Sequence, residues 1–372
     1  MQSGIKHNIL LNILAFISTV FLISGCNLSA TDRGSGCSPC GPHSIVFSAD
    51  GTAYLLGISQ LLAINPQGNI TLNKKTVPNL LGRYSDMLDI SNDGNIWEVT
   101  NDSANSLTNV TIYNLQGNLV RQITIDIPMV TSVKVTPSTD IGWVGGYTKS
   151  FNGVTTITDT KLEAVNISGQ TLTSFTLPGN PTLYNGWIYN IVKLAISSAD
   201  GTIWAWTPGY LSGYLFTGLI YGPYPVNLLE SSNPFFIGCG TNEKWIVVNP
   251  VTNDIWMGNP ATTTVLALSP NGTVQFQKNL DIYVSTMAVS PKTGNVWIGS
   301  NNKIDVLDPY GNVIKQLTLR YLNCITYIAI SPLDDTVWVG SILNGNKNIF
   351  ILDENGNIVN SINVPVICAQ CG

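Results

Sequence analysis

The residues best suited to chemistry in this 372-residue chain are four cysteines near its two ends. Cys37 and Cys40 belong to a CSPCG motif, and Cys368 and Cys371 belong to a CAQCG motif. Four thiolates at this spacing can hold Zn²⁺ or iron tetrahedrally, whereas in an oxidising compartment the same thiols form disulfides. A redox-active pair is a third interpretation, but no strand–helix–strand pattern surrounds either motif. Disulfides and a metal site both stay open at this point.

Aromatic residues crowd the stretch from residue 184 to residue 245. Trp204 and Trp245 lie within short apolar runs and are expected in the core. Five others lie in or beside segments rich in Gly and Pro, where they could stack on sugar rings or form a protein-binding patch. These five candidate binding residues are Tyr184, Trp187, Tyr189, Tyr210 and Tyr214.

Charged candidates are few, since only 10% of the residues are charged. Arg83 and Arg320 are each followed by Tyr and are further binding candidates. In the propeller inferred below, both are predicted to lie on connections near the mouth of the central channel. The acidic residues that could accompany them are Asp86, Asp89 and Glu230. No paired-carboxylate spacing, nucleophile elbow or Gly-rich phosphate loop occurs, so we assign no catalytic residue.

The elements that must position these residues are copies of one unit, seen most clearly in residues 290–319. This unit contains apolar runs of five to seven residues bounded by Gly, Asn, Asp or Pro, which is the pattern of short strands. A Trp-bearing second strand recurs as NIWEVT, IGWVGG, TIWAWT, DIWMGN, NVWIGS and TVWVGS, and TAYLLG carries Tyr54 in the Trp position. A third strand with its turn recurs as LLAINPQGNI, VTIYNLQGNL, TVLALSPNGT, KIDVLDPYGN and NIFILDENGN.

The repeat length identifies the architecture. The spacing from Trp256 to Trp297 equals that from Trp297 to Trp338, and a period of about 40–45 residues with four strands is typical of β-propellers. The sequence therefore predicts an all-β, seven-bladed β-propeller with four antiparallel strands per blade. The predicted blades are 44–78, 86–126, 130–177, 190–230, 244–281, 284–319 and 326–364.

The connections differ between the two ends of the strands. Turns from first to second and from third to fourth strands are short, as in SADG, SNDG, NPQG and DPYG, and all lie at one face. Longer connections are expected at the opposite face, in 146–160, 178–190, 207–213 and 231–244. Because loops on a rigid scaffold are where binding is usually placed, we expect the binding face above blades three to five.

The W-[IVM]-G strands and the LDxxGNVI turn resemble NHL-like and virginiamycin-B-lyase-like propellers, and the SPDGTxWV-type hairpins resemble YncE-like surface propellers. The resemblance covers roughly 44–364 and concerns repeat motifs, so it implies architecture more than activity. The lyase of this group is understood to use His, Glu and a divalent metal. After residue 25 this chain has a single histidine, His43, which precedes the first blade. That departure argues against lyase activity.

Residues 1–25 are predicted to be a signal segment, with Lys6 before an apolar run from Ile9 to Ile23. The end of this run, LISGC, resembles the lipobox of bacterial lipoproteins, and the resemblance implies that Cys26 is lipidated. Residues 26–43 then form a flexible tether with the first CxxC motif, 44–364 the propeller, and 365–372 a C-terminal CxxC segment. The resemblance implies an extracytoplasmic protein that is lipid-anchored to the cell or outer membrane. The alternatives for residues 1–25 are an ordinary signal peptide or an uncleaved anchor.

Two more cysteines, Cys239 and Cys324, lie on connections into predicted blades and are interpreted as buried thiols or as disulfide partners. A net charge of −5 without a Lys/Arg cluster excludes nucleic acid as an expected partner. The function predicted is a membrane-anchored binding scaffold for a protein or glycan, with no cofactor other than Zn or Fe at the terminal thiols. The alternatives are a propeller lyase or hydrolase using Asp, Glu and Arg at the channel mouth, and a metal- or redox-linked module built on the four terminal cysteines.

Overall fold

The computed structural model divides the chain into two units, 1–34 and 35–372. The description below concerns the second unit. The structure describes residues 44–57, 60–76, 87–102, 107–137, 139–151, 155–177, 183–184, 187–188, 193–197, 201–211, 215–224, 235–237, 245–258, 263–320, 322, 324–343 and 346–364. No helix in this part of the chain is long and apolar enough to cross a membrane.

Seven four-stranded antiparallel sheets make up the described part of the fold, each from four consecutive strands. The first sheet contains β1 (Ser44–Phe47), β2 (Ala53–Leu56), β3 (Gln60–Ile64) and β4 (Ile70–Lys75). The second sheet contains β5 (Leu88–Ile90), β6 (Ile96–Asp102), β7 (Leu107–Tyr113) and β8 (Leu119–Ile125). The third sheet contains β9 (Met129–Val135), β10 (Ile141–Phe151), β11 (Thr155–Asn166) and β12 (Thr171–Leu177). The fourth sheet contains β15 (Lys193–Ile196), β16 (Ile203–Leu211), β17 (Leu215–Tyr224) and β18 (Phe235–Ile237).

The fifth sheet contains β19 (Trp245–Val248), β20 (Ile255–Gly258), β21 (Thr264–Leu268) and β22 (Val274–Asn279). The sixth sheet contains β23 (Thr286–Val289), β24 (Val296–Ser300), β25 (Lys303–Leu307) and β26 (Val313–Thr318). The last contains β27 (Cys324–Ile330), β28 (Val337–Leu343), β29 (Asn346–Leu352) and β30 (Ile358–Asn363). A separate hairpin, β13 (Leu183–Tyr184) with β14 (Trp187–Ile188), lies between the third and fourth sheets in the sequence.

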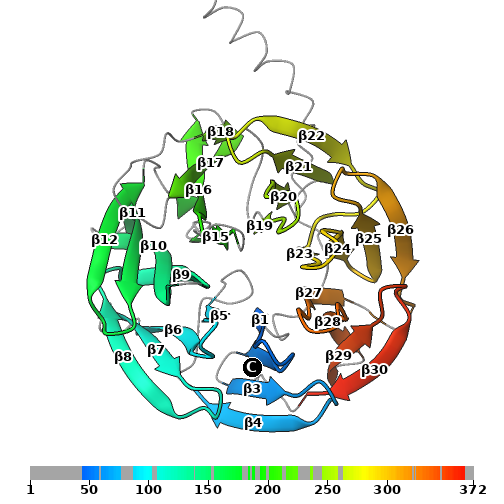
Figure 1. The fold of residues 1–372 in the computed structure, drawn as a ribbon. Helices are drawn as coiled ribbons and strands as arrows, with labels where there is room; N and C mark the ends of the chain where they lie inside the picture. Colours follow the sequence, from blue (N-terminus) through cyan, green and yellow to red (C-terminus); the bar gives the residue numbers. More distant parts are fainter. Residues whose placement is uncertain are drawn as a thin grey trace, which may run out of the picture. The chain divides into compact units, whose positions relative to one another are not determined.

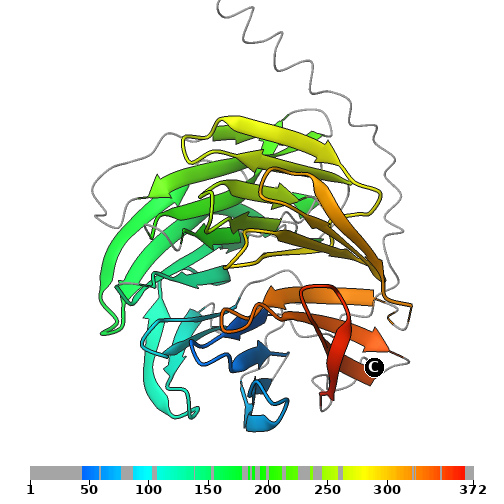
Figure 2. The same ribbon diagram turned by 45° about the vertical axis from the view of Figure 1, so that its right-hand side comes forward.

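The first strand of each sheet lies innermost, around a common axis (Figure 1). These strands contact one another in the cyclic order β1, β5, β9, β15, β19, β23, β27 and back to β1. The fourth strands form the outer rim, and Figure 2 shows the same sheets after a turn of 45° about the vertical axis. The prediction of an all-β propeller with four-stranded antiparallel blades is confirmed.

The repeat Trp residues are core residues, as expected from their position between neighbouring sheets. Five of them are almost completely buried, namely Trp97, Trp143, Trp204, Trp256 and Trp338, and Trp297 and its counterpart Tyr54 are nearly so. Each faces a first-strand residue of its own sheet, as Trp97 faces Asp89 and Trp143 faces Lys134. This register defines equivalent positions in all seven sheets.

The third and fourth sheets depart from the sequence prediction. The predicted connections 146–160 and 207–213 are largely strand, because β10 pairs with β11, and β16 with β17, well beyond the repeat unit. Cross-strand hydrogen bonding in a long hairpin stabilises Gly- and Thr-rich segments that look like loops in sequence. In the fourth sheet the longer hairpin moves the last strand to Phe235–Ile237, beyond the predicted limit of residue 230.

Tight turns at one end of the strands connect neighbouring sheets through hydrogen bonds. The Ser290 hydroxyl lies 2.8 and 2.7 Å from the two carboxylate oxygens of Asp335 in the next sheet. The Ser197 hydroxyl similarly contacts Asn253 Oδ1 at 2.7 Å. Asp335 and Asn253 both have left-handed backbone (φ 62° and 61°), which Asn and Asp tolerate better than other non-Gly residues. These residues therefore both form the turn and accept a bond from the preceding sheet.

The first and last sheets join through apolar packing. A single core cluster contains Ile45, Leu55 and Leu62 from the first sheet together with Ile349, Ile362 and Val364 from the last. The rings of Phe47 and Trp338 meet edge to face, with centroids 5.5 Å apart. We call this interface the seam. Among the described strands none is exchanged across it, since both sheets consist of consecutive strands.

Candidate functional site around the propeller axis

The first strands, which surround the axis, carry polar side chains at two sets of equivalent positions. At the position opposite the repeat aromatic residue, five sheets have a small apolar residue. These are Val46, Ala195, Val247, Ala288 and Ala329. The second sheet instead has Asp89 and the third has Lys134.

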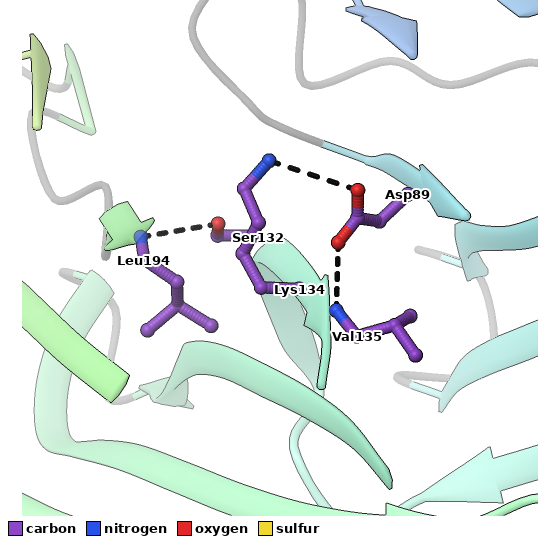
Figure 3. Close-up of polar contacts among 5 residues, drawn as sticks. All are labelled: Asp89, Ser132, Lys134, Val135 and Leu194. Atoms are coloured by element: carbon purple, nitrogen blue, oxygen red, sulfur yellow. Dashed lines mark hydrogen bonds and ion pairs between the residues drawn. The ribbon is translucent and has the colours of Figure 1, made fainter. Parts of the chain in front are cut away.

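Asp89 and Lys134 contact each other across the boundary between β5 and β9 (Figure 3). Lys134 Nζ lies 4.0 Å from Asp89 Oδ1, and the Val135 amide donates to Asp89 Oδ2 at 2.7 Å. Both side chains are partly buried, with 21% and 15% of their surface exposed. A carboxylate that accepts a backbone bond and pairs with an ammonium group is held firmly in place. Asp89 therefore connects the second sheet to the third.

Hydroxyl groups make similar connections at another equivalent position. The Leu194 amide donates to Ser132 Oγ at 3.3 Å, which joins the third sheet to the fourth (Figure 3). The Ile328 amide donates to Thr286 Oγ1 at 3.1 Å, which joins the sixth sheet to the seventh. Both hydroxyl-bearing residues are fully buried. At this position a small polar side chain accepts a hydrogen bond from a backbone N–H group on the inner edge of the neighbouring sheet's first strand.

The same position carries large side chains in three other sheets, namely Lys193, Trp245 and Tyr327. The buried Lys193 ammonium lies 4.9 Å from the centroid of the Trp245 ring, within cation–π range. The Trp245 ring meets the Tyr327 ring edge to face at 5.7 Å and donates its Nε1–H to the Ser285 carbonyl at 2.7 Å. These contacts connect the fourth, fifth, sixth and seventh sheets near the axis.

These contacts hold the polar side chains near the axis in fixed positions. The carboxylate of Asp89 is engaged by two donors, and Lys193 lies against an aromatic ring. Within the residues that the structure describes, no group of three His, Cys, Asp or Glu side chains could hold a metal ion. The axis therefore supplies a rigid inner wall that fixes the connections on either side.

The predicted binding residues lie partly on described backbone. Tyr184 and Trp187 are direct cross-strand partners in the β13–β14 hairpin, and Tyr210 lies on β16 opposite Phe216. Tyr210 is thus on a strand and not in the predicted loop. Arg320 is exposed in the connection after β26. The other predicted site residues lie outside the described residues, namely Arg83, Asp86, Tyr189, Tyr214, Glu230, Cys26, Cys37, Cys40, Cys368 and Cys371.

Sequence reasoning missed Lys134, Lys193 and Ser132. The available signal was the alignment of the repeats, because Lys134 occupies a first-strand position where five other units have Ala or Val. Trp245 was expected in the core; it lies in β19 and is half-buried. Its contact with Lys193 could not be predicted because the two residues belong to different sheets.

Comparison with known proteins supports the fold. A solved structure of hydrazine synthase from Kuenenia stuttgartiensis is similar to this chain, with a TM-score of 0.63, 12% sequence identity, and coverage of 89% of this chain and 100% of the other. At that identity the likeness concerns the fold alone. No family model matches the chain, and no curated protein sequence is similar to it. A specific kinship with NHL-like or YncE-like propellers is therefore an inference from the repeat motifs.

Proposed function

We propose that this protein is a binding scaffold that engages a protein or glycan partner through the connections at the long-loop face of the third and fourth sheets. The observation that carries the proposal is the β13–β14 hairpin, in which Tyr184 lies opposite Trp187. In the described part of the chain, no other pair of neighbouring sheets is separated by an additional hairpin. Aromatic residues on a hairpin fixed to a rigid scaffold are suited to stacking on sugars or on a partner surface.

The proposal includes seven blades in one closed ring. The cyclic contacts among the seven innermost strands and the apolar seam support this number. The fourth blade is the least regular, since its outer strand β18 has three residues, whereas the other outer strands have six or seven.

We also propose that the protein is extracytoplasmic and held to a membrane by a lipid on Cys26, and that the terminal cysteines pair as disulfides or bind Zn or Fe. The LISGC sequence and the even number of remaining cysteines support these assignments. Mass spectrometry of the intact, unreduced protein tests them together. It measures the acyl mass, the number of disulfides and any retained metal.

Binding is tested with a lipid-free Cys26→Ser form, used as the probe on a glycan array and in affinity capture from extracellular extracts. We expect Trp187→Ala and Tyr184→Ala to weaken capture of the identified partner at least tenfold. Tyr310→Ala is the matched control, because Tyr310 is 77% exposed in the tight turn between β25 and β26, at the other end of the strands. Equal loss in all three variants, or no loss in the two hairpin variants, would overturn the proposed face.

A further inference from the structure

Glu98 is a buried carboxyl group that none of the functions above uses. It follows the repeat Trp on β6 and is only 1% exposed, and its Oε2 atom has no hydrogen-bond partner among the described residues. The equivalent residues in most other sheets are apolar, for example Val144, Ile298 and Val339. A carboxyl group at a position built for apolar packing requires a reason of its own.

The surroundings of Glu98 come from the first and second sheets. Burial raises the pKa of Glu98 to about 7, and the hydroxyls of Thr76 and Tyr113 and the charge of Lys74 oppose that rise. The pKa of Tyr113 is itself raised to about 12, by burial and by the negative charge of Glu98. Tyr113 ends β7 of the second sheet, whereas Lys74 and Thr76 belong to or follow β4 of the first. Lys74 is thus the cation that acts on Glu98.

Lys74 already has a structural role in the interface. Its ammonium group donates to the Gly117 carbonyl at 3.0 Å, in the turn between β7 and β8, and lies 4.7 Å from the centroid of the Tyr113 ring. Two other lysines make the same contact between sheets. Lys278 donates to the Gly311 carbonyl at 2.8 Å, and Lys315 donates to the Glu354 carbonyl at 2.9 Å. The sheets that receive these two bonds carry Ile298 and Val339 in place of Glu98.

We propose that Lys74 is a proton-dependent latch between the first two sheets. While Glu98 is protonated, Lys74 holds the Gly117 carbonyl. When Glu98 releases its proton to solvent, the buried carboxylate draws the ammonium group away, because an anionic oxygen is a stronger acceptor than an amide carbonyl and a buried charge requires a partner. The turn at residues 114–118 then loses this bond and keeps the one that the Tyr54 hydroxyl donates to the Leu115 carbonyl at 3.1 Å, so it is held less tightly, whereas the turn held by Lys278 is unchanged. This device is independent of the binding face proposed above.

Hydrogen exchange of the full-length chain, read by mass spectrometry, tests the latch. Peptides covering 114–118 are compared with peptides covering 308–312 between pH 5.5 and 8.5, after correction for the intrinsic exchange rate. We expect protection of 114–118 to fall about tenfold across this range, the loss that corresponds to one hydrogen bond of the usual net strength. Protection of 308–312 is expected to stay constant.

Variants assign the effect to the two residues. Glu98→Gln should keep the low-pH protection of 114–118 at every pH, and Lys74→Met should give the roughly tenfold lower protection at every pH. Lys278→Met is the matched control and should affect only 308–312. The proposal is overturned if 114–118 shows no pH dependence relative to 308–312, or if Glu98→Gln retains the wild-type dependence.

Discussion

At the scale of single residues, Glu98 gives the free energy of unfolding a defined pH dependence. Its pKa is about 7 in the folded protein and near the ordinary value of 4.5 in the unfolded chain. Because burial favours the neutral acid, its stabilising contribution is complete below about pH 4.5 and decreases as the pH rises towards 7. Above pH 7 the folded chain contains an ionised carboxylate that it accommodates poorly.

We therefore predict that Glu98→Gln has nearly wild-type stability at pH 4.5 and is more stable than the wild type at pH 8, by about 3 kcal/mol. Urea unfolding followed by tryptophan fluorescence at several pH values measures this difference. Glu354→Gln changes an exposed carboxylate and serves as the control, with a pH profile parallel to that of the wild type. The prediction would be contradicted if the wild type were more stable than Glu98→Gln at pH 8.

Residue types in the repeat were sufficient to predict the core but not the polar wall near the axis. Trp97, Trp256 and Trp338 are buried because the repeat places a large ring between neighbouring sheets. The ion pair of Asp89 with Lys134 joins two sheets. The sequence around each residue does not indicate its partner, because the partner belongs to a different sheet.

At the scale of elements, the tight turns between first and second strands are cross-links between neighbouring sheets. The Ser290 hydroxyl accepts from the Thr293 amide at 3.0 Å, so its own proton is directed to Asp335. Ser290 is buried, and loss of its acceptor would leave an unsatisfied donor.

We predict that Asp335→Gly lowers the free energy of unfolding by about 1–2 kcal/mol, since Gly keeps the left-handed backbone but removes the acceptor. Thermal or urea unfolding measures the change. Asn301→Gly is the control, because Asn301 has φ 50° in an exposed turn, and Gly there should be neutral or slightly stabilising. Equal effects of the two variants would show that the bond to Ser290 contributes nothing.

The sequence was sufficient to predict most strands because their turns contain Gly, Asn and Asp at fixed positions. It was insufficient for 146–160 and 207–213, where Gly, Ser and Pro suggested loops. Pairing between β10 and β11, and between β16 and β17, overrides these local preferences, since each strand supplies the hydrogen-bond partners that the other needs. The fourth sheet is irregular for the same reason, because the long pairing of β16 with β17 places its outer strand β18 further along the chain.

At the scale of the whole molecule, the seam closes the propeller through apolar contacts. Ile45 and Val364, at the two ends of the described chain, belong to one core cluster. In the sequence, Cys40 lies four residues before Ser44, and Cys368 lies four residues after Val364.

We predict that a chain of residues 44–364, without either CxxC segment, folds into the same propeller with a cooperative thermal transition. Far-UV circular dichroism and calorimetry measure this outcome. The full-length oxidised protein should exceed it in stability by no more than about 4–5 kcal/mol for each long-range disulfide. Phe47→Ala removes a half-buried ring packed on Trp338 and should cost about 2 kcal/mol in either form, less than the roughly 3–5 kcal/mol of a fully buried ring. Failure of the 44–364 chain to fold would show that closure requires the segments that carry the CxxC motifs.

The apolar seam has a consequence for connectivity. Since each sheet consists of consecutive strands and the two ends of the described chain, at Ile45 and Val364, meet at one interface, the backbone could be joined there and opened elsewhere. A circular permutant opened between the fifth and sixth sheets, in residues 280–285, would keep every sheet whole. The order in which the ribosome delivers the sheets would then change, while the set of contacts that stabilises the folded ring would stay the same.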